Sequence, residues 1–94
     1  MNLDFIHDEK KRKFFAELEG KELFITYDEP DENTYDFRLT YVPPPLRRRG
    51  LAGKIIRFAL ETARRKNKKV IPSCWAVSKY VNQNPQYRSL LTDF

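Results

Sequence analysis

Hydrophobic residues in the first part of the chain follow the short period of β-strands. Residues 13–19 and 21–28 are dense in Phe, Leu, Ile and Tyr and meet at Glu19-Gly20, a pattern that predicts a hairpin. Residues 28–33 (DEPDEN) predict the next turn, and apolar residues then alternate with polar ones from Tyr35 to Tyr41, as in a half-buried strand. Three antiparallel strands are therefore expected, preceded by a charged, solvated segment at 1–12 in which His7 is incidental.

A helical period replaces this alternation after Pro43-Pro44-Pro45. Proline donates no backbone N–H, so this run ends the third strand. From Gly50 onward the apolar residues recur at the spacing of one helix face, and the basic run at 64–66 complements the negative end of a helix dipole near Asn67. The residues of this predicted face are Ala52, Ile55, Ile56, Ala59, Leu60 and Ala63.

The last quarter of the chain predicts one short strand and two short helices. Val70 and Ile71 read as a buried strand, and Pro72 prevents that strand from pairing fully along both edges. Residues 76–81 carry apolar side chains at helical spacing, and Asn84-Pro85 restarts a helix with an Asn N-cap and proline at its first position. The expected fold is α/β (α+β): an antiparallel three-stranded sheet, a parallel β-α-β crossover and short C-terminal helices, in one domain over 1–94.

Charge is distributed unevenly along the chain. Residues 1–42 hold 11 acidic and 6 basic side chains, whereas residues 43–94 hold 2 and 12, so the halves carry −5 and +10. The basic half suggests an anionic partner, although a solvated surface explains the charge equally well. The single cysteine, Cys74, excludes an internal disulfide and a cysteine-based zinc site, and no metal is expected. Without a signal-like start or long apolar run, a cytoplasmic protein without membrane contact is expected.

The segment from Arg47 to Gly53 combines arginines with small residues where the long helix begins. The first N–H groups of a helix have no internal partner, and the helix dipole adds partial positive charge. Small side chains let a phosphate approach these groups, and guanidinium groups stay positive at any physiological pH. The segment therefore predicts a diphosphate site formed by Arg47, Arg48, Arg49, Gly50, Leu51, Ala52 and Gly53.

Two motifs in this chain resemble a known superfamily. Arg47-x-x-Gly50-x-Ala52, between a strand and a helix, resembles the pyrophosphate loop of the GNAT superfamily of acetyl-CoA-dependent N-acetyltransferases. Val70-x-Pro72-x-Cys74, then Tyr80-Val81, then Asn84-Pro85-Gln86-Tyr87 resembles a small single-domain GNAT-like family. The resemblance covers about residues 13–91. This chain departs from the family at Arg48, where glycine is usual, and at Leu39-Thr40, where His-Thr is usual.

The resemblance implies a fold, a co-substrate and a set of site residues. Acetyl-CoA would place its diphosphate on the arginine-rich loop and its pantetheine arm between two splayed parallel strands, residues 35–42 and 69–73. Thr40 would line this opening, and backbone N–H groups near Val42 would polarise the thioester carbonyl. The turn with Asn84 and Tyr87 would cover the acetyl end. The acceptor would be an unidentified amine, on a small molecule or a protein.

Cys74 and Tyr80 are the candidates for chemistry. Cys74 lies where a strand passes into a helix, so it is either a nucleophile for the thioester or a small core residue. Tyr80 resembles the general acid that protonates the departing CoA thiolate in many GNAT enzymes, although its spacing also suits the core. Trp75 could line the acceptor pocket or cap the core.

The expected function is transfer of an acetyl group to an amine by a monomer or weak homodimer. One alternative is a module that binds or senses acyl-CoA without efficient transfer. A second, ranked well below, is a small basic domain that binds nucleic acid through residues 47–49 and 64–69.

Overall fold

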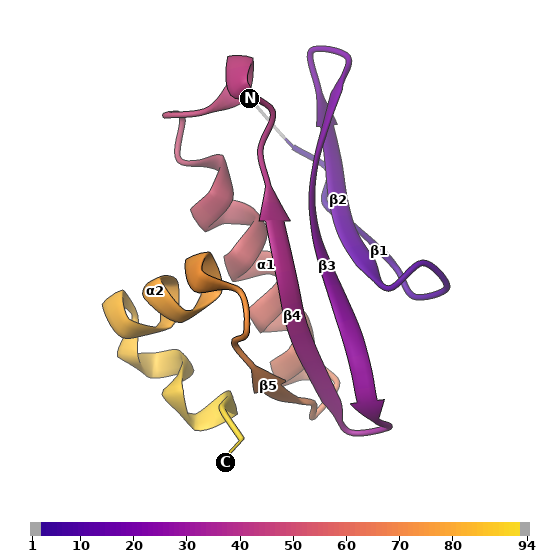
Figure 1. Ribbon diagram of the computed structural model, residues 1–94, viewed down its shortest axis with the longest axis vertical. Helices are drawn as coiled ribbons and strands as arrows, with labels where there is room; N and C mark the ends of the chain where they lie inside the picture. The colour runs from indigo at the N-terminus through magenta and orange to yellow at the C-terminus, as the bar shows by residue number, and fades with distance from the viewer. Residues whose placement is uncertain (1–2, 93–94) are drawn as a thin grey trace.

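The computed structural model describes residues 3–92 as a five-stranded sheet with its helices on one face (Figure 1). The strands lie in the order β1-β2-β3-β4-β5, the first four antiparallel and β5 parallel to β4. Their bounds are β1 Ile6–Asp8, β2 Lys13–Leu18, β3 Lys21–Asp31, β4 Thr34–Tyr41 and β5 Lys69–Ile71. The helices are η1 Pro44–Leu46, α1 Leu51–Arg65, α2 Trp75–Gln83 and η2 Pro85–Leu90, with η1 and η2 of the 3-10 type. The mixed α+β class and the parallel crossover are as predicted.

Three local expectations were wrong. Residues 6–8 do not form a solvated lead-in; they form the strand β1, which pairs with β2. Within this strand Ile6 and Asp8 face away from the helices, while His7 faces the core. The turn expected over 28–33 is shorter, since β3 continues to Asp31. The side chain of Asn84 does not cap the helix that follows; its amide donates to the Tyr80 carbonyl (2.8 Å) and so closes the end of α2.

A β-bulge at Arg38 changes which side chains of β4 face the helices. Thr26 pairs with Leu39, but its neighbour Tyr27 pairs with Phe37, so Arg38 is the extra residue. Because side chains alternate along a strand, an extra residue reverses the alternation beyond it. Leu39 is consequently 51% exposed, on the face away from the helices, although its apolar character had predicted burial.

The same reversal places Thr40 and Val42 on the helix side of the sheet. Thr40 pairs with the buried Ile25, which fixes the face on which it lies. The strand beside it, β5, pairs with β4 only at residues 34–36, and the last backbone hydrogen bond between the two segments runs from the Cys74 N–H to the Phe37 carbonyl (2.8 Å). Beyond this point the chain leaves for α2, so β4 and the segment after β5 separate next to Thr40.

Helix α1 covers the inner face of the sheet, and α2 and η2 pack against α1. The buried side chains of α1 include Ile55, Ala59 and Leu60, which meet strand residues such as Phe14 and Phe37. The expected helix face is therefore confirmed, except that Ala52 is only partly buried. The Tyr87 hydroxyl donates to Glu61 of α1 (2.6 Å) and ties η2 to this layer. The core thus fixes the start of α1 next to the end of β4.

Candidate functional site

The loop between β4 and α1 is held in one conformation by local contacts. The Arg47 Nε donates to the Val42 carbonyl (2.8 Å), and the Leu46 N–H donates to the Pro43 carbonyl in η1. Arg48 and Gly50 both have left-handed backbone conformations, with φ of 66° and 74°. Glycine adopts this conformation readily, whereas an L-residue is strained in it. The glycine that is usual at position 48 in GNAT-like proteins fits this geometry, and Arg48 adopts it with a side chain.

The first turn of α1 presents unpaired backbone donors. The first hydrogen bond of the helix runs from the Lys54 N–H to the Gly50 carbonyl (3.3 Å), so the N–H groups of residues 51–53 precede it. The first turn holds no acidic side chain, and the Gly50 position has open space around it. The partial positive charge of this helix end is therefore not neutralised by the helix itself.

The three arginines before the helix have different partners. Arg49 donates to the Glu19 carboxylate (2.6 and 3.5 Å) and to the Pro45 carbonyl (3.2 Å), so it ties the loop to the β2–β3 hairpin. The hydrogen bond from Arg49 also lowers the pKa of the Glu19 carboxyl. Arg47 is bonded to the loop itself, and within residues 3–92 the exposed Arg48 guanidinium has no partner. Arg48 is thus the arginine available to a bound anion.

Two adjoining depressions run along the start of α1. The first, about 120 Å³, is lined by Val42, Leu46, Arg47, Arg48, Gly50, Leu51 and Ala52. The second, about 240 Å³, is lined by Ala52, Gly53, Ile56, Trp75, Ala76, Lys79, Tyr80 and Gln83. Both are lined by Ala52, and we call the two depressions together, from the arginine-rich loop to the surface of α2, the groove. Most of the predicted loop residues line this groove; Arg49 does not.

Gly53 sets the distance between the two helices that border the groove. A Cβ at this position would lie 3.7 Å from the Tyr80 ring, so the ring packs directly on the α1 backbone. Tyr80 is half-buried, and within the described chain its hydroxyl has no hydrogen-bond partner. The site therefore includes a phenol that borders the groove and is free to bond to a ligand.

Cys74 and Thr40 meet where β4 and β5 separate. The Thr40 Oγ1 lies 3.3 Å from the Cys74 Sγ, and Cys74 is 8% exposed at the start of α2. The two side chains come from segments 34 residues apart, and the bulge in β4 turns Thr40 toward this contact. The structure thus brings together two residues that were predicted separately.

Asn84 and Tyr87 are committed to structural contacts. Asn84 closes the end of α2 through Tyr80, and Tyr87 is buried with its hydroxyl on Glu61. Burial and the bond to Glu61 raise the pKa of the Tyr87 phenol. Neither residue lines the groove, and the Tyr87 ring lies 5.9 Å from that of Tyr80. Their contacts position α2 and, through it, the wall of the groove.

Trp75 is not part of the core. It is 73% exposed, lines the groove and lies under the Lys79 ammonium, 5.0 Å from the ring centroid. The groove is also lined by Lys79, Ala76 and Gln83, none of which was predicted as a site residue. Ala76 lies four residues before Tyr80 and Gln83 three residues after it, so these two share the helix face of Tyr80. The helical period of the sequence could therefore have predicted them.

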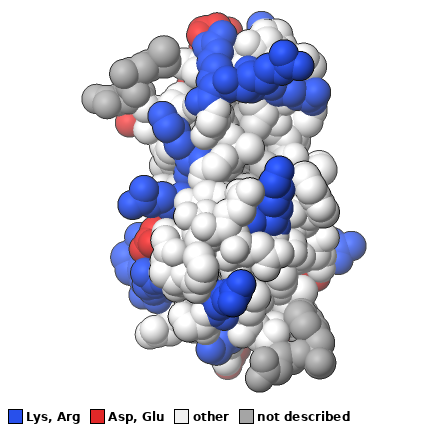
Figure 2. All heavy atoms as spheres, turned by 90° about the vertical axis from the view of Figure 1, so that its left-hand side faces the viewer, with Lys and Arg blue, Asp and Glu red and all other residues white. Residues whose placement is uncertain are grey.

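Basic side chains dominate the surface around the groove. Figure 2 shows the side of the molecule that carries α2 and η2, where Lys and Arg spread over the face and gather at the end where η1 lies, with few Asp or Glu among them. Among the charged side chains on this face the basic ones are in excess, and the field there favours an anionic ligand.

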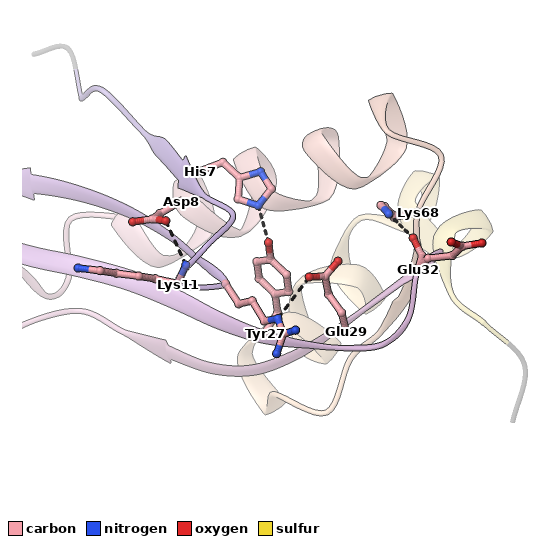
Figure 3. Close-up of polar contacts among 8 residues, drawn as sticks. His7, Asp8, Lys11, Tyr27, Glu29, Glu32 and Lys68 are labelled. Atoms are coloured by element: carbon pink, nitrogen blue, oxygen red, sulfur yellow. Dashed lines mark hydrogen bonds and ion pairs between the residues drawn. The ribbon is translucent and has the colours of Figure 1, made fainter.

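His7 belongs to a separate cluster at the other end of α1. Figure 3 shows its ring pointing toward Tyr27, whose hydroxyl lies 2.6 Å from Nε2. The ring also stacks on Phe14, with centroids 4.1 Å apart. Burial lowers the pKa of His7 and raises the pKa values of Tyr27 and Tyr35. The histidine is therefore a core-anchoring group and not the incidental surface residue that the sequence suggested.

Comparison with known proteins identifies the family. The family model described as GCN5-related N-acetyl-transferase matches residues 13–90. Protein NATD1 of Xenopus tropicalis is 32% identical over 81 residues, covering 84% of this chain and 74% of that protein, and human Protein NATD1 is 31% identical with 84% and 72% coverage. The solution structure of a GCN5-like protein from Staphylococcus aureus superposes with a TM-score of 0.75 at 25% identity, covering 99% and 91% of the two chains. The chain belongs to the GCN5-related N-acetyltransferase (GNAT) family.

No group of metal-binding side chains is present in residues 3–92, and no helix in that range is long and apolar enough to cross a membrane.

Proposed function

We propose that this protein binds acetyl-CoA in the groove along the start of α1 and transfers the acetyl group to an amine. Membership of the GNAT family supports acetyl-CoA as the co-substrate. The observation that carries the proposal is the start of α1, where unpaired N–H groups, the left-handed Gly50 and the unpartnered Arg48 border one depression. A diphosphate there would accept hydrogen bonds from the backbone and from the guanidinium group.

The loop residues divide into those that contact the phosphates and those that hold the loop. Gly50, Leu51, Ala52 and Gly53 supply backbone donors, and Arg48 supplies an exposed guanidinium group without a partner in residues 3–92. Arg47 and Arg49 shape the loop through Val42 and Glu19. The basic face in Figure 2 raises the local concentration of an anionic co-substrate.

The acetyl end would lie where β4 and β5 separate. From the groove this point is reached past Val42, which lines the first depression, to the pair formed by Thr40 and Cys74. Backbone N–H groups near Val42 would stabilise negative charge on the thioester oxygen. Holding the carbonyl there also fixes its distance from the attacking atom, which supplies much of the rate gain of a bound reaction.

Two routes of transfer use these residues differently. In direct transfer, the neutral amine attacks the thioester carbon, the C–S bond breaks, and Tyr80 gives a proton to the departing thiolate while the amine loses one. In stepwise transfer, the Cys74 thiol gives up its proton and the thiolate attacks the thioester carbon; the C–S bond to CoA breaks, and the CoA thiolate takes up a proton. The neutral amine then attacks the acetyl-cysteine and loses a proton, and the Cys74 sulfur is released as the leaving group and regains its proton. The Thr40 Oγ1 lies 3.3 Å from the Cys74 Sγ, and either atom can be the donor; in the stepwise route the hydroxyl would donate to the sulfur.

Mass spectrometry with isotope-labelled acetyl-CoA tests the transfer. Incubation of the wild type alone would show one labelled acetyl group on Cys74 by the stepwise route, and addition of a panel of amines would show labelled product. Binding of acetyl-CoA without product or acetyl-enzyme would identify a CoA-binding module. Salt-dependent binding of oligonucleotides without binding of CoA would assign the basic face to nucleic acid and contradict the proposal.

A further inference from the structure

The face of the sheet opposite the helices carries a continuous row of apolar side chains. Ile6 pairs with Phe15, Phe15 with Phe24, and Phe24 with Tyr41, so the four side chains cross β1 to β4 on one face. Leu39 extends the row by one position along β4. We name this set, Ile6, Phe15, Phe24, Leu39 and Tyr41, the outer face.

The outer face is open to solvent over much of its length. Ile6, Leu39 and Tyr41 are 49%, 51% and 38% exposed, and with Trp75 they are the large apolar side chains most exposed in the described chain. The helices lie on the other side of the sheet (Figure 1). The bulge at Arg38 contributes directly, because it turns Leu39 and Tyr41 outward. A contiguous exposed apolar patch of this kind is typical of an interaction site.

Carboxylates without partners border this face. A hollow of about 360 Å³ is lined by Asp4, Ile6, Phe15 and Glu17. Within residues 3–92 neither Asp4 nor Glu17 forms an ion pair or side-chain hydrogen bond. The basic residues of this face are already paired, Lys13 with Glu22 (2.7 Å) and Arg38 with Asp36 (3.2 Å). A hollow that combines two unpaired carboxylates with the apolar side chains of Ile6 and Phe15 complements a cationic group on an apolar stem.

We propose that the outer face docks a basic polypeptide segment of another protein, with lysine or arginine side chains at Asp4 and Glu17 and apolar side chains along the row. A second copy of this chain is disfavoured as the partner, because the basic residues of its own outer face, Lys13 and Arg38, are already paired and would leave Asp4 and Glu17 without a cation. The row ends at Tyr41, next to Thr40 on the opposite face of the same strand. If the docked segment is also the amine acceptor, which rests on the proposed function, a lysine beyond Tyr41 would reach the point where β4 and β5 separate.

Docking of the basic segment is tested in the absence of acetyl-CoA, so that the result does not depend on whether the protein transfers acetyl groups. A short synthetic peptide of lysine, leucine and serine is titrated into isotope-labelled protein, and amide NMR signals are followed. The expected shifts concentrate at Ile6, Phe15, Phe24 and Tyr41, weaken with added salt, and are absent with peptides in which glutamate replaces lysine or serine replaces leucine. Equal shifts with all three peptides, or shifts outside the outer face, would overturn the proposal.

Substitutions in this chain separate the contribution of the two carboxylates to peptide binding from the contribution of the apolar side chains of the outer face. Asp4→Asn combined with Glu17→Gln is expected to weaken peptide binding about fivefold, since two partly exposed ion pairs are lost. Glu32→Gln, an exposed carboxyl in the β3–β4 turn, is the matched control and should leave binding unchanged. Leu39→Ser tests the row, and dispersed NMR signals establish that each variant is folded. Equal loss in the Glu32 control, or concentration-dependent dimerisation through the outer face in place of peptide binding, contradicts the proposal.

Discussion

The Thr40 hydroxyl lies 3.3 Å from the Cys74 sulfur, at the point where β4 and β5 cease to pair. This contact exists because the bulge at Arg38 reverses the alternation of β4 and turns Thr40 toward the helices. It links the two strands that would enclose the acetyl end of the co-substrate. The first prediction concerns this pair.

Thr40→Val removes the hydroxyl but keeps the branched shape. If the hydroxyl stabilises the Cys74 thiolate, the variant should lose acetylation of Cys74 by roughly tenfold or more, the scale of one charge-assisted hydrogen bond. Thr40→Ser retains a hydroxyl and should restore most of the rate. The rate of labelled acetyl-cysteine formation is measured by mass spectrometry, with CoA affinity as a control that should not change. Equal rates in both variants would restrict Thr40 to packing.

Cys74→Ala and Cys74→Ser separate chemistry from packing. A packing role predicts that alanine lowers the free energy of unfolding by about 1 kcal/mol and that serine, which buries a hydroxyl, lowers it at least as much. A nucleophilic role predicts that both variants bind CoA but form no acetyl-enzyme, because a neutral hydroxyl is a poorer nucleophile than a thiolate. Urea unfolding and product formation are measured on the same preparations. Normal turnover in both variants would move the assignment to Tyr80.

Two substitutions at Gly50, by glutamate and by glutamine, separate the effect of a negative charge from the effect of backbone strain. Glutamate and glutamine at position 50 meet the same open space and the same strain of φ 74°, about 1–2 kcal/mol. Only glutamate sets a negative charge beside the proposed diphosphate. Isothermal titration with CoA should therefore show that Gly50→Glu binds at least about tenfold more weakly than Gly50→Gln. Equal affinities would place the diphosphate elsewhere.

The His7 cluster predicts a pH dependence of stability. Burial lowers the pKa of His7 below 6.5 in the folded state, so the fold favours the neutral ring. The contribution to stability is therefore present above the unfolded pKa of about 6.5 and is lost as pH falls below it. His7→Gln, which cannot gain this charge, should unfold in urea with a flatter pH dependence between about pH 7 and 5. Parallel curves for the two proteins would show that His7 does not titrate with folding.

The sequence predicted the elements better than the faces they present. The helix at Leu51–Arg65 and the strand at Thr34–Tyr41 follow from strong periods. The exposure of Leu39 could not be predicted, because apolar and polar residues continue to alternate through the bulge and nothing marks Arg38 as the extra residue. Arg48 illustrates a further limit, since its left-handed backbone depends on how the loop closes on Val42.

The sequence also could not predict which side chains the arginines of the loop bind. Each of the three arginines of the loop carries the same charge, yet Arg49 is bound to Glu19, which is distant in the chain, and Arg48 has no partner within the described residues. The sequence left Trp75 open between the acceptor pocket and the core, and the turn into α2 leaves it exposed beside Lys79. Both outcomes depend on tertiary contacts that local patterns do not encode.

The most direct test of the account is an NMR titration of the wild type with acetyl-CoA. The proposed site predicts that the amide signals of residues 48–53 shift more than those of residues 13–28, because the diphosphate accepts hydrogen bonds from the start of α1. The strands at 13–28 lie in the same sheet and provide an internal reference. Saturable shifts at residues 48–53, along the adjoining groove and at the Thr40–Cys74 pair would support the account; equal or absent shifts at saturating acetyl-CoA would contradict it.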